Sequence, residues 1–95
     1  MLLHIVCFKY KQDVGGDTRN EHRVRLRALA DADGIVELKV GEDVVRSARS
    51  YDTGLVITFR DRAALDAYAK HPRHVPVAQL GVANCESIVA VDFEA

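Results

Sequence analysis

Four side chains capable of acid–base chemistry occupy unusual places in this sequence. His4 and Asp92 each lie in a short apolar segment, one near each end of the chain, and Tyr68 and His74 flank a break made by Pro72. A carboxylate beside an imidazole fixes its tautomer and raises its pKa, so the imidazole can act as a general base near neutral pH. A tyrosine hydroxyl can donate a hydrogen bond to a carbonyl. These four residues therefore form a candidate catalytic site for a carbonyl compound.

A structural role for the same residues stays open. A histidine and an aspartate in a small core often make only a satisfied polar contact. His22 is expected to be a partly buried packing residue on a helix face. His71 is expected near the C-terminus of a helix, where the helix dipole favours an imidazolium.

We expect no metal and no cofactor. His71 and His74 are three residues apart, but Pro72 breaks the helix that would align them, and no third ligand has a suitable spacing. The sequence contains neither a phosphate-binding loop nor a dinucleotide fingerprint. Cys7 and Cys85 lack a CxxC motif and are expected to be structural thiols.

Alternation of apolar residues predicts four strands. Residues 2–10 and 51–59 are apolar on both faces, as central strands are. Residues 35–45 have one polar face, which suits a sheet edge. The last strand, with two apolar faces, is expected at residues 87–93.

The first helix is expected at residues 18–33, where apolar residues recur at helical spacing. Thr18 and Glu21 have the spacing of a capping box, and Gly34 is placed to end the helix with a positive φ. Arginines recur every four residues and predict a solvated face, at Arg19, Arg23 and Arg27.

The second helix is expected to begin after Asp61, a good N-cap, and to end near His71 because Pro72 follows. A looser stretch with one more helical turn should lead to the last strand. The order is β-α-β-β-α-β, which is the ferredoxin-like string of an α+β fold. Right-handed crossovers place both helices on one face of a four-stranded antiparallel sheet.

This arrangement brings the candidate site together. The first and last strands are neighbours in such a sheet, so His4 and Asp92 should face the helices side by side. The break at Pro72 should let His74 lie over both. A carboxylate buried in an apolar strand needs a partner, so His74 is expected to hydrogen-bond to Asp92 and to have a raised pKa. The walls of a ligand cavity between helices and sheet are expected from Val6, Phe8, Leu55 and Ile57.

The opposite face of the sheet has nothing in the chain to cover it. The apolar residues expected there are Leu3, Ile5, Cys7, Val56, Val89 and Val91. A second copy packed sheet against sheet is the simplest cover, which predicts a two-fold homodimer and a dimeric α+β barrel.

Length and composition bound the remaining possibilities. Ninety-five residues predict a single domain at 1–95. The net charge of −1 is unlike that of a nucleic-acid binder, and no apolar run approaches a membrane span. No signal peptide is expected, and two cysteines make no disulfide framework, so a cytoplasmic location is predicted.

Several segments together resemble the stress-responsive A/B barrel (Dabb) family. They include His4-Ile5-Val6-x-Phe8-Lys9 at the start, Leu65-x-x-Tyr68-x-x-His71-Pro72-x-His74 in the second half, and Val91-Asp92-Phe93 near the end. The resemblance covers the whole chain, and Tyr-x-x-His-Pro-x-His is its most specific part. It implies a ferredoxin-like protomer that forms a homodimer, in a family whose members mostly lack an assigned reaction.

The chain also resembles a plant branch of this family that cyclises linear polyketides by aldol chemistry without a cofactor. The resemblance carries the site of that branch onto His4, Tyr68 and His74, with Asp92 beside the second histidine. A further histidine of that branch falls on Thr53, which cannot serve as a base, so polyketide cyclisation does not follow from the resemblance.

Two functions therefore remain. The first is a stress-associated homodimer that binds a small, largely apolar or aromatic molecule between helices and sheet. The second is a cofactor-free enzyme acting on a carbonyl compound, such as a cyclase, an isomerase or a monooxygenase-like protein, that uses His74 with Tyr68 and His4. The sequence leaves open whether the protein has any turnover.

Overall fold

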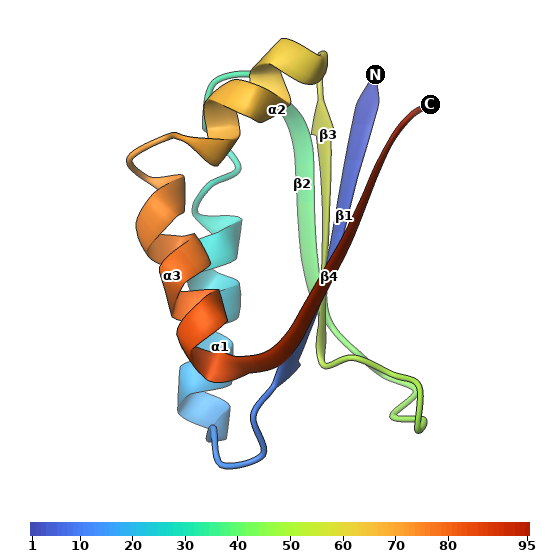
Figure 1. Cartoon of the computed structure of the whole chain (residues 1–95), viewed down its shortest axis with the longest axis vertical. Coiled ribbons are helices and arrows are strands. Elements are labelled where there is room, and N and C mark those ends of the chain that lie inside the picture. The colour runs from blue at the N-terminus through green and yellow to red at the C-terminus, as the bar shows by residue number, and fades with distance from the viewer.

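The computed structural model describes residues 1–95 as one curved antiparallel sheet with its helices on a single face (Figure 1). The strands lie in the order β2-β3-β1-β4, so β1 and β3 are central and β2 and β4 form the edges. The elements are β1 (Leu2–Tyr10), α1 (Gly16–Arg27), β2 (Ile35–Glu42), β3 (Thr53–Phe59), α2 (Arg62–Ala69), α3 (His74–Asn84) and β4 (Cys85–Glu94). This confirms the ferredoxin-like α+β fold and the edge position of β2.

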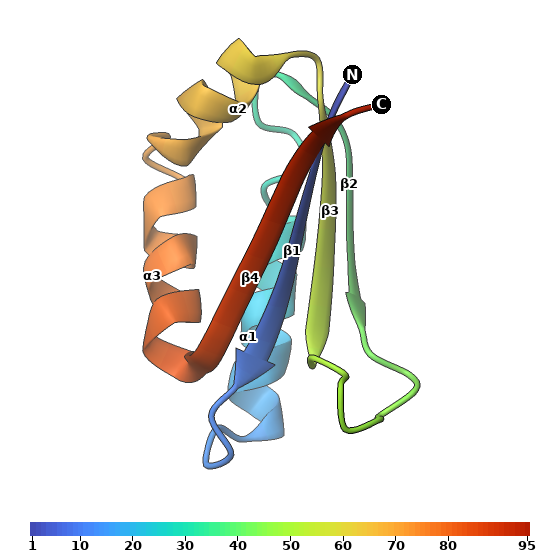
Figure 2. The same cartoon turned by 45° about the vertical axis from the view of Figure 1, so that its right-hand side comes forward.

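A third helix replaces the loose stretch expected before the last strand. α3 runs over eleven residues, His74–Asn84, and lies beside α1 on the same face of the sheet (Figure 2). α3 tolerates Pro76 because this is the third residue of the helix, and first-turn residues have no intrahelical acceptor for an N–H. The order is therefore β-α-β-β-α-α-β.

The expected bounds of the first helix were wrong. α1 begins at Gly16 after an extended Gly15, with no side-chain cap, so Thr18 and Glu21 form no capping box. The helix ends at Arg27, and the chain continues in tight turns closed by bonds such as Leu29 N to the Leu26 carbonyl. Gly34 does have a positive φ of 86°, but it lies in the turn directly before β2 rather than at the end of the helix.

The second helix begins as expected. The Asp61 carboxylate accepts a hydrogen bond of 2.9 Å from the Ala64 N–H, which satisfies one of the free donors of the first turn of α2. α2 ends at Ala69, three residues before Pro72.

The core lies between the helices and the inner face of the central strands. It includes Val6, Phe8, Leu55, Ile57 and Phe59 from β1 and β3. Both edges are more open than the centre, and the inner residues Ile88 and Ala90 of β4 remain exposed. No helix of the structure is long and apolar enough to span a membrane.

The outer face of the sheet is uncovered in the single chain. Its exposed large side chains include Val56, Val89, Val91 and Phe93. These residues alternate with the inward-facing ones, as the sequence pattern predicts.

Candidate functional site

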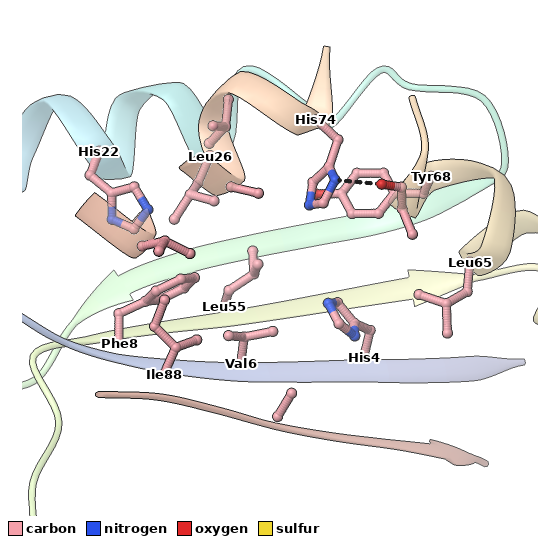
Figure 3. A pocket seen from close by; sticks show the side chains of 15 residues that line it. His4, Val6, Phe8, His22, Leu26, Leu55, Leu65, Tyr68, His74 and Ile88 are labelled. Carbon is pink, nitrogen blue, oxygen red and sulfur yellow. Dashed lines mark hydrogen bonds between the residues drawn. The ribbon is translucent and has the colours of Figure 1, made fainter. Parts of the chain in front are cut away.

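An apolar cavity of about 290 Å³ lies between the sheet and the helices. Figure 3 shows side chains from α1, α2, α3 and the sheet turned toward it. Val82 of α3 and Ile88 of β4 line it and are 68% and 39% exposed, so the cavity opens to solvent between these two elements. Its volume is at the lower end of the range for small-molecule sites.

Apolar side chains form most of the cavity wall. Twelve of the fifteen lining residues are hydrophobic, and the other three are histidines. The lining residues are His4, Val6, Phe8, His22, Leu26, Leu55, Leu65, Tyr68, Ala69, His74, Val77, Ala78, Val82, Ile88 and Ala90. Polar groups are thus few and belong to histidines and one tyrosine.

The expected ligand-contacting residues divide into two groups. Val6, Phe8 and Leu55 line the cavity. Ile57 does not, because it is fully buried in the core beneath the wall. The side chain of Ile57 does point inward, as expected. Its position along β3, however, places it in the packed core and out of contact with the open space of the cavity.

His4 and Asp92 occupy neighbouring strands and form a hydrogen-bonded pair at the site. They are register partners in the β1–β4 ladder, and the His4 Nδ1 hydrogen-bonds to a carboxylate oxygen of Asp92. Because a carboxylate accepts, Nδ1 carries the proton and Nε2 of a neutral His4 has the free lone pair. His4 is therefore the imidazole that the carboxylate orients.

The expected hydrogen bond between His74 and Asp92 was wrong. His74 is the first residue of α3, and its Nδ1 lies 3.3 Å from the Ala69 carbonyl at the end of α2. Burial lowers the pKa of His74, and the neighbouring His4 and His71 lower it further. The expected rise of this pKa was therefore also wrong, and Asp92 is not a buried residue that needs His74.

Tyr68 has a buried hydroxyl group without a partner. The residue is 4% exposed, and its Oη has no hydrogen-bond partner. Its ring lies 4.3 Å from the His74 ring, measured between centroids, and 5.2 Å from that of Phe59. Burial raises the pKa of Tyr68 to about 12, so its hydroxyl stays protonated and can donate to a ligand.

His4, Tyr68 and His74 all lie toward one end of the cavity, as Figure 3 shows. The sequence brings them together because α2 and the start of α3 pass over the end of the sheet where β1 begins. Asp92 reaches the site only through His4, since it does not line the cavity.

His22 lines the other end of the cavity, beside Phe8 (Figure 3). It was expected to be a packing residue, and it is indeed buried, at 1% exposure. Its Nδ1 lies 2.7 Å from the Tyr10 Oη, whereas its Nε2 has no partner. Burial, together with the nearby Arg23, lowers the pKa of His22 to about 4.

Arg23 and Thr53 belong to the same hydrogen-bond network as His22, through Tyr10. Arg23 is buried rather than solvated, contrary to the repeating pattern of arginines on α1, and its Nε donates to Thr53 Oγ1 at 3.0 Å. Thr53 Oγ1 lies 3.1 Å from the Tyr10 Oη. Thr53 therefore belongs to a polar network next to the cavity and not to the cavity wall.

The two cysteines are free, and they are not opposite each other in the β1–β4 ladder. Cys7 is opposite Val89, and Cys85 is opposite Tyr10. Burial raises the pKa of the Cys85 thiol to about 11, which leaves it protonated and unreactive at neutral pH.

Comparisons with known proteins identify the family of this chain. The family model for the stress responsive A/B barrel domain matches residues 2–95. A stress-response A/B barrel domain-containing protein of Arabidopsis thaliana is 32% identical over 92 residues, which are 95% of this chain and 35% of that protein. The chain thus spans about a third of the length of this curated relative.

Solved structures agree with the fold. A dimeric ferredoxin-like protein of unknown function from Jannaschia sp. is 34% identical, with a TM-score of 0.83 and coverage of 99% of this chain and 98% of that one. A hydroxynitrile lyase from Passiflora edulis is 22% identical, with a TM-score of 0.87 and coverage of 97% and 90%. The second likeness shows the fold alone.

Proposed function

Since this chain belongs to the stress-responsive A/B barrel domain family, we propose that it forms a homodimer in which each protomer binds one small, largely apolar molecule. The observation that carries the proposal is the cavity of about 290 Å³, with its apolar wall and its few polar groups. Ligand sites are typically apolar and carry a small number of polar groups that fix orientation.

The polar groups indicate what the molecule should carry. Tyr68 has a hydroxyl that is protonated, buried and unpartnered. An unsatisfied buried hydroxyl costs roughly 1–3 kcal/mol, which a ligand oxygen would recover. The proposed ligand is therefore an apolar molecule with an oxygen that reaches Tyr68, as a ketone or an aldehyde does.

The homodimer follows from the outer face of the sheet. Val56, Val89 and Val91 are exposed there in the single chain, and the similar Jannaschia protein is described as dimeric. A second copy on this face would remove these side chains from water, which is the usual reason for such a patch.

Calorimetric titration with butylbenzene tests the binding proposal. We expect one molecule per chain, because each protomer has its own cavity. Ala78→Phe should abolish binding because Ala78 lines the cavity, whereas Ala83→Phe, on the exposed side of α3, should not. Equal binding by both variants, or none by the wild type, would contradict the proposal.

A second candidate is a cofactor-free enzyme that removes a proton next to a carbonyl. The observation that favours it is the His4–Asp92 hydrogen bond beside Tyr68 and His74 in one cavity. His4 Nε2 would take the α-proton, Asp92 would stabilise the imidazolium, and Tyr68 would donate to the enolate oxygen. This differs from the sequence-based hypothesis, in which His74 was the base.

Deuterium exchange tests this second candidate without knowledge of the natural substrate. Benzylacetone in D₂O exchanges its α-protons when a base forms its enolate and solvent returns deuterium. If the candidate is right, the protein accelerates this exchange, and His4→Gln removes the acceleration. Exchange at the rate of buffer alone, or unchanged in His4→Gln, would rule out His4 as a base.

A further inference from the structure

We propose that His22 is a specificity-determining residue whose Nε2–H donates a hydrogen bond to an acceptor oxygen of the bound molecule. This inference rests on the proposed function, because it concerns the far end of the same cavity. It adds a second recognition point to the ligand, at the opposite end from Tyr68, His74 and His4 (Figure 3).

The tautomer of His22 follows from its neighbours. A guanidinium only donates, so Thr53 Oγ1 accepts from Arg23 Nε at 3.0 Å. Thr53 can then give its hydrogen to the Tyr10 Oη, at 3.1 Å, and Tyr10 can give its own to His22 Nδ1, at 2.7 Å. This direction points each hydroxyl hydrogen away from the positive guanidinium, as its charge favours. A neutral His22 that accepts at Nδ1 carries its proton on Nε2.

The Nε2–H is a donor without an acceptor. His22 is 1% exposed, and no protein group bonds to its Nε2. A buried unsatisfied donor is costly, and such groups in folded proteins call for an explanation. An oxygen of a ligand that fills the cavity would supply the missing acceptor.

Gly81 of α3 packs against this donor without a side chain of its own. A Cβ atom at position 81 would lie 3.2 Å from His22 Nε2 and 3.5 Å from a ring carbon of Phe8. Any larger residue would therefore press against the donor. Nε2 is itself buried, next to Gly81 and Phe8, so a ligand oxygen reaches the Nε2–H by displacing these contacts slightly.

The protonation state of His22 decides which ligand groups can bind at this end of the cavity. Burial and Arg23 keep the pKa of His22 near 4, so the imidazole is neutral at pH 7 and offers one fixed donor. The partner must be an oxygen that accepts a hydrogen bond, such as a carbonyl or a carboxylate. A ligand that places an ammonium group here would set a donor against the Nε2–H, and the two could form no hydrogen bond.

A matched pair of probes tests the role of His22. Benzylacetone and butylbenzene share a carbon skeleton and differ by one carbonyl oxygen, and both are titrated into a Tyr68→Phe background so that this oxygen does not bind to Tyr68 instead. We expect the ratio of their two dissociation constants to shift about tenfold toward butylbenzene in His22→Leu, the fold-change for one hydrogen bond to a buried donor. His22→Gln, which keeps an N–H on a long side chain, should restore part of the preference.

Two further variants act on the donor without removing the imidazole. Tyr10→Phe removes the group that holds Nδ1 unprotonated, and Gly81→Ala places a methyl group against Nε2. Both should reduce the preference for benzylacetone. Long-range ¹H–¹⁵N spectra should show the proton on His22 Nε2 in the wild type and a mixture of tautomers in Tyr10→Phe. His71→Gln, outside the cavity, is the control.

The outcomes separate this inference from the proposed function. Binding of neither probe contradicts the proposed function and this inference with it. If both probes bind but His22→Leu leaves their ratio unchanged, the role of His22 is wrong while the cavity remains a binding site. A wild-type spectrum with the proton on Nδ1 overturns the inference whichever probe binds.

Discussion

At the scale of single residues, the cavity is notable for how few polar atoms it has and how firmly they are held. His4 is oriented by Asp92, and His22 is oriented by Tyr10. The Tyr68 hydroxyl is held by packing against Phe59 and His74 rather than by a hydrogen bond. An otherwise apolar space with oriented polar groups at its ends is suited to recognising one molecule in one orientation.

The stability of the protein should fall as the solution becomes acidic, because of His22. Its pKa is about 4 in the folded protein against 6.5 as the ordinary value, so the unfolded chain binds a proton first as the pH falls. The contribution is complete above pH 6.5 and is lost progressively down to about pH 4. Its full size is about 3 kcal/mol.

Chemical denaturation at several pH values measures this loss. Burial lowers the His74 pKa as well, so His74 contributes in the same direction. We expect His22→Gln to flatten the decline between pH 6.5 and 4, since glutamine does not titrate. A decline as steep in His22→Gln as in the wild type would show that other groups cause it.

Asp92→Asn should affect orientation more than stability. The His4–Asp92 pair lies at an open sheet edge, with the Asp92 side chain 37% exposed, and such pairs contribute about 1 kcal/mol or less. We expect the unfolding free energy to change by no more than about 1 kcal/mol. The tautomer of His4, followed in ¹H–¹⁵N spectra, should become mixed. A tautomer that stays fixed would mean that Asp92 does not orient His4.

The sequence was sufficient to place His4 beside Asp92, but not to identify His4 as the histidine that hydrogen-bonds to Asp92. The alternation of strands and the pairing of first and last strands suffice to place these two side by side. His74 was assigned to Asp92 on the belief that Asp92 is buried, and the open edge at β4 removes that need. His22 was missed, although inward-facing Tyr10 and Thr53 on the central strands signal buried hydroxyls that require a polar partner.

At the scale of elements, the main surprise is the segment between α2 and β4. Pro72 predicted a break followed by a looser stretch, yet Pro72 only separates α2 from α3, and Pro76 lies in the first turn of α3. Both positions suit proline because no intrahelical hydrogen bond is lost there. The resulting helix supplies one wall of the cavity and sets His74 at its own beginning.

The turn before β2 should depend on Gly34. Its φ is 86°, and a Cβ atom there would lie 2.7 Å from the Ala64 Cβ. Gly34→Ala therefore combines left-handed strain with a clash, and it should cost about 2 kcal/mol or more. Gly16→Ala is the control, since nothing lies near its Cβ position and its φ is not positive. Thermal unfolding of both variants gives the comparison, and equal midpoints would contradict this account.

At the scale of the whole molecule, the two faces of the sheet have different roles. The inner face carries the cavity, and the outer face exposes Val56, Val89 and Val91. The apolar residues of both faces were predictable from alternation alone. The size of the cavity was not, because it depends on how far the helices lie from the sheet.

The proposed homodimer should be sensitive to charge on the outer face. Val91 is 54% exposed in the single chain, so lysine there harms the protomer little but would bury an unpaired charge in a dimer. We expect Val91→Lys to sediment as a monomer, whereas Val24→Lys, on the exposed side of α1, should sediment like the wild type. A wild-type protein that sediments as a monomer at micromolar concentration would contradict the homodimer.

The most direct test of the central claim is a methyl NMR titration with butylbenzene, because the inner and outer faces of the sheet carry different methyl groups. Binding in the cavity should shift the methyl signals of Val6, Leu55, Leu65 and Val77. Shifts confined to outer-face methyl groups, such as those of Val56 and Val91, or no shifts at all, would contradict the claim that the space between helices and sheet is the binding site.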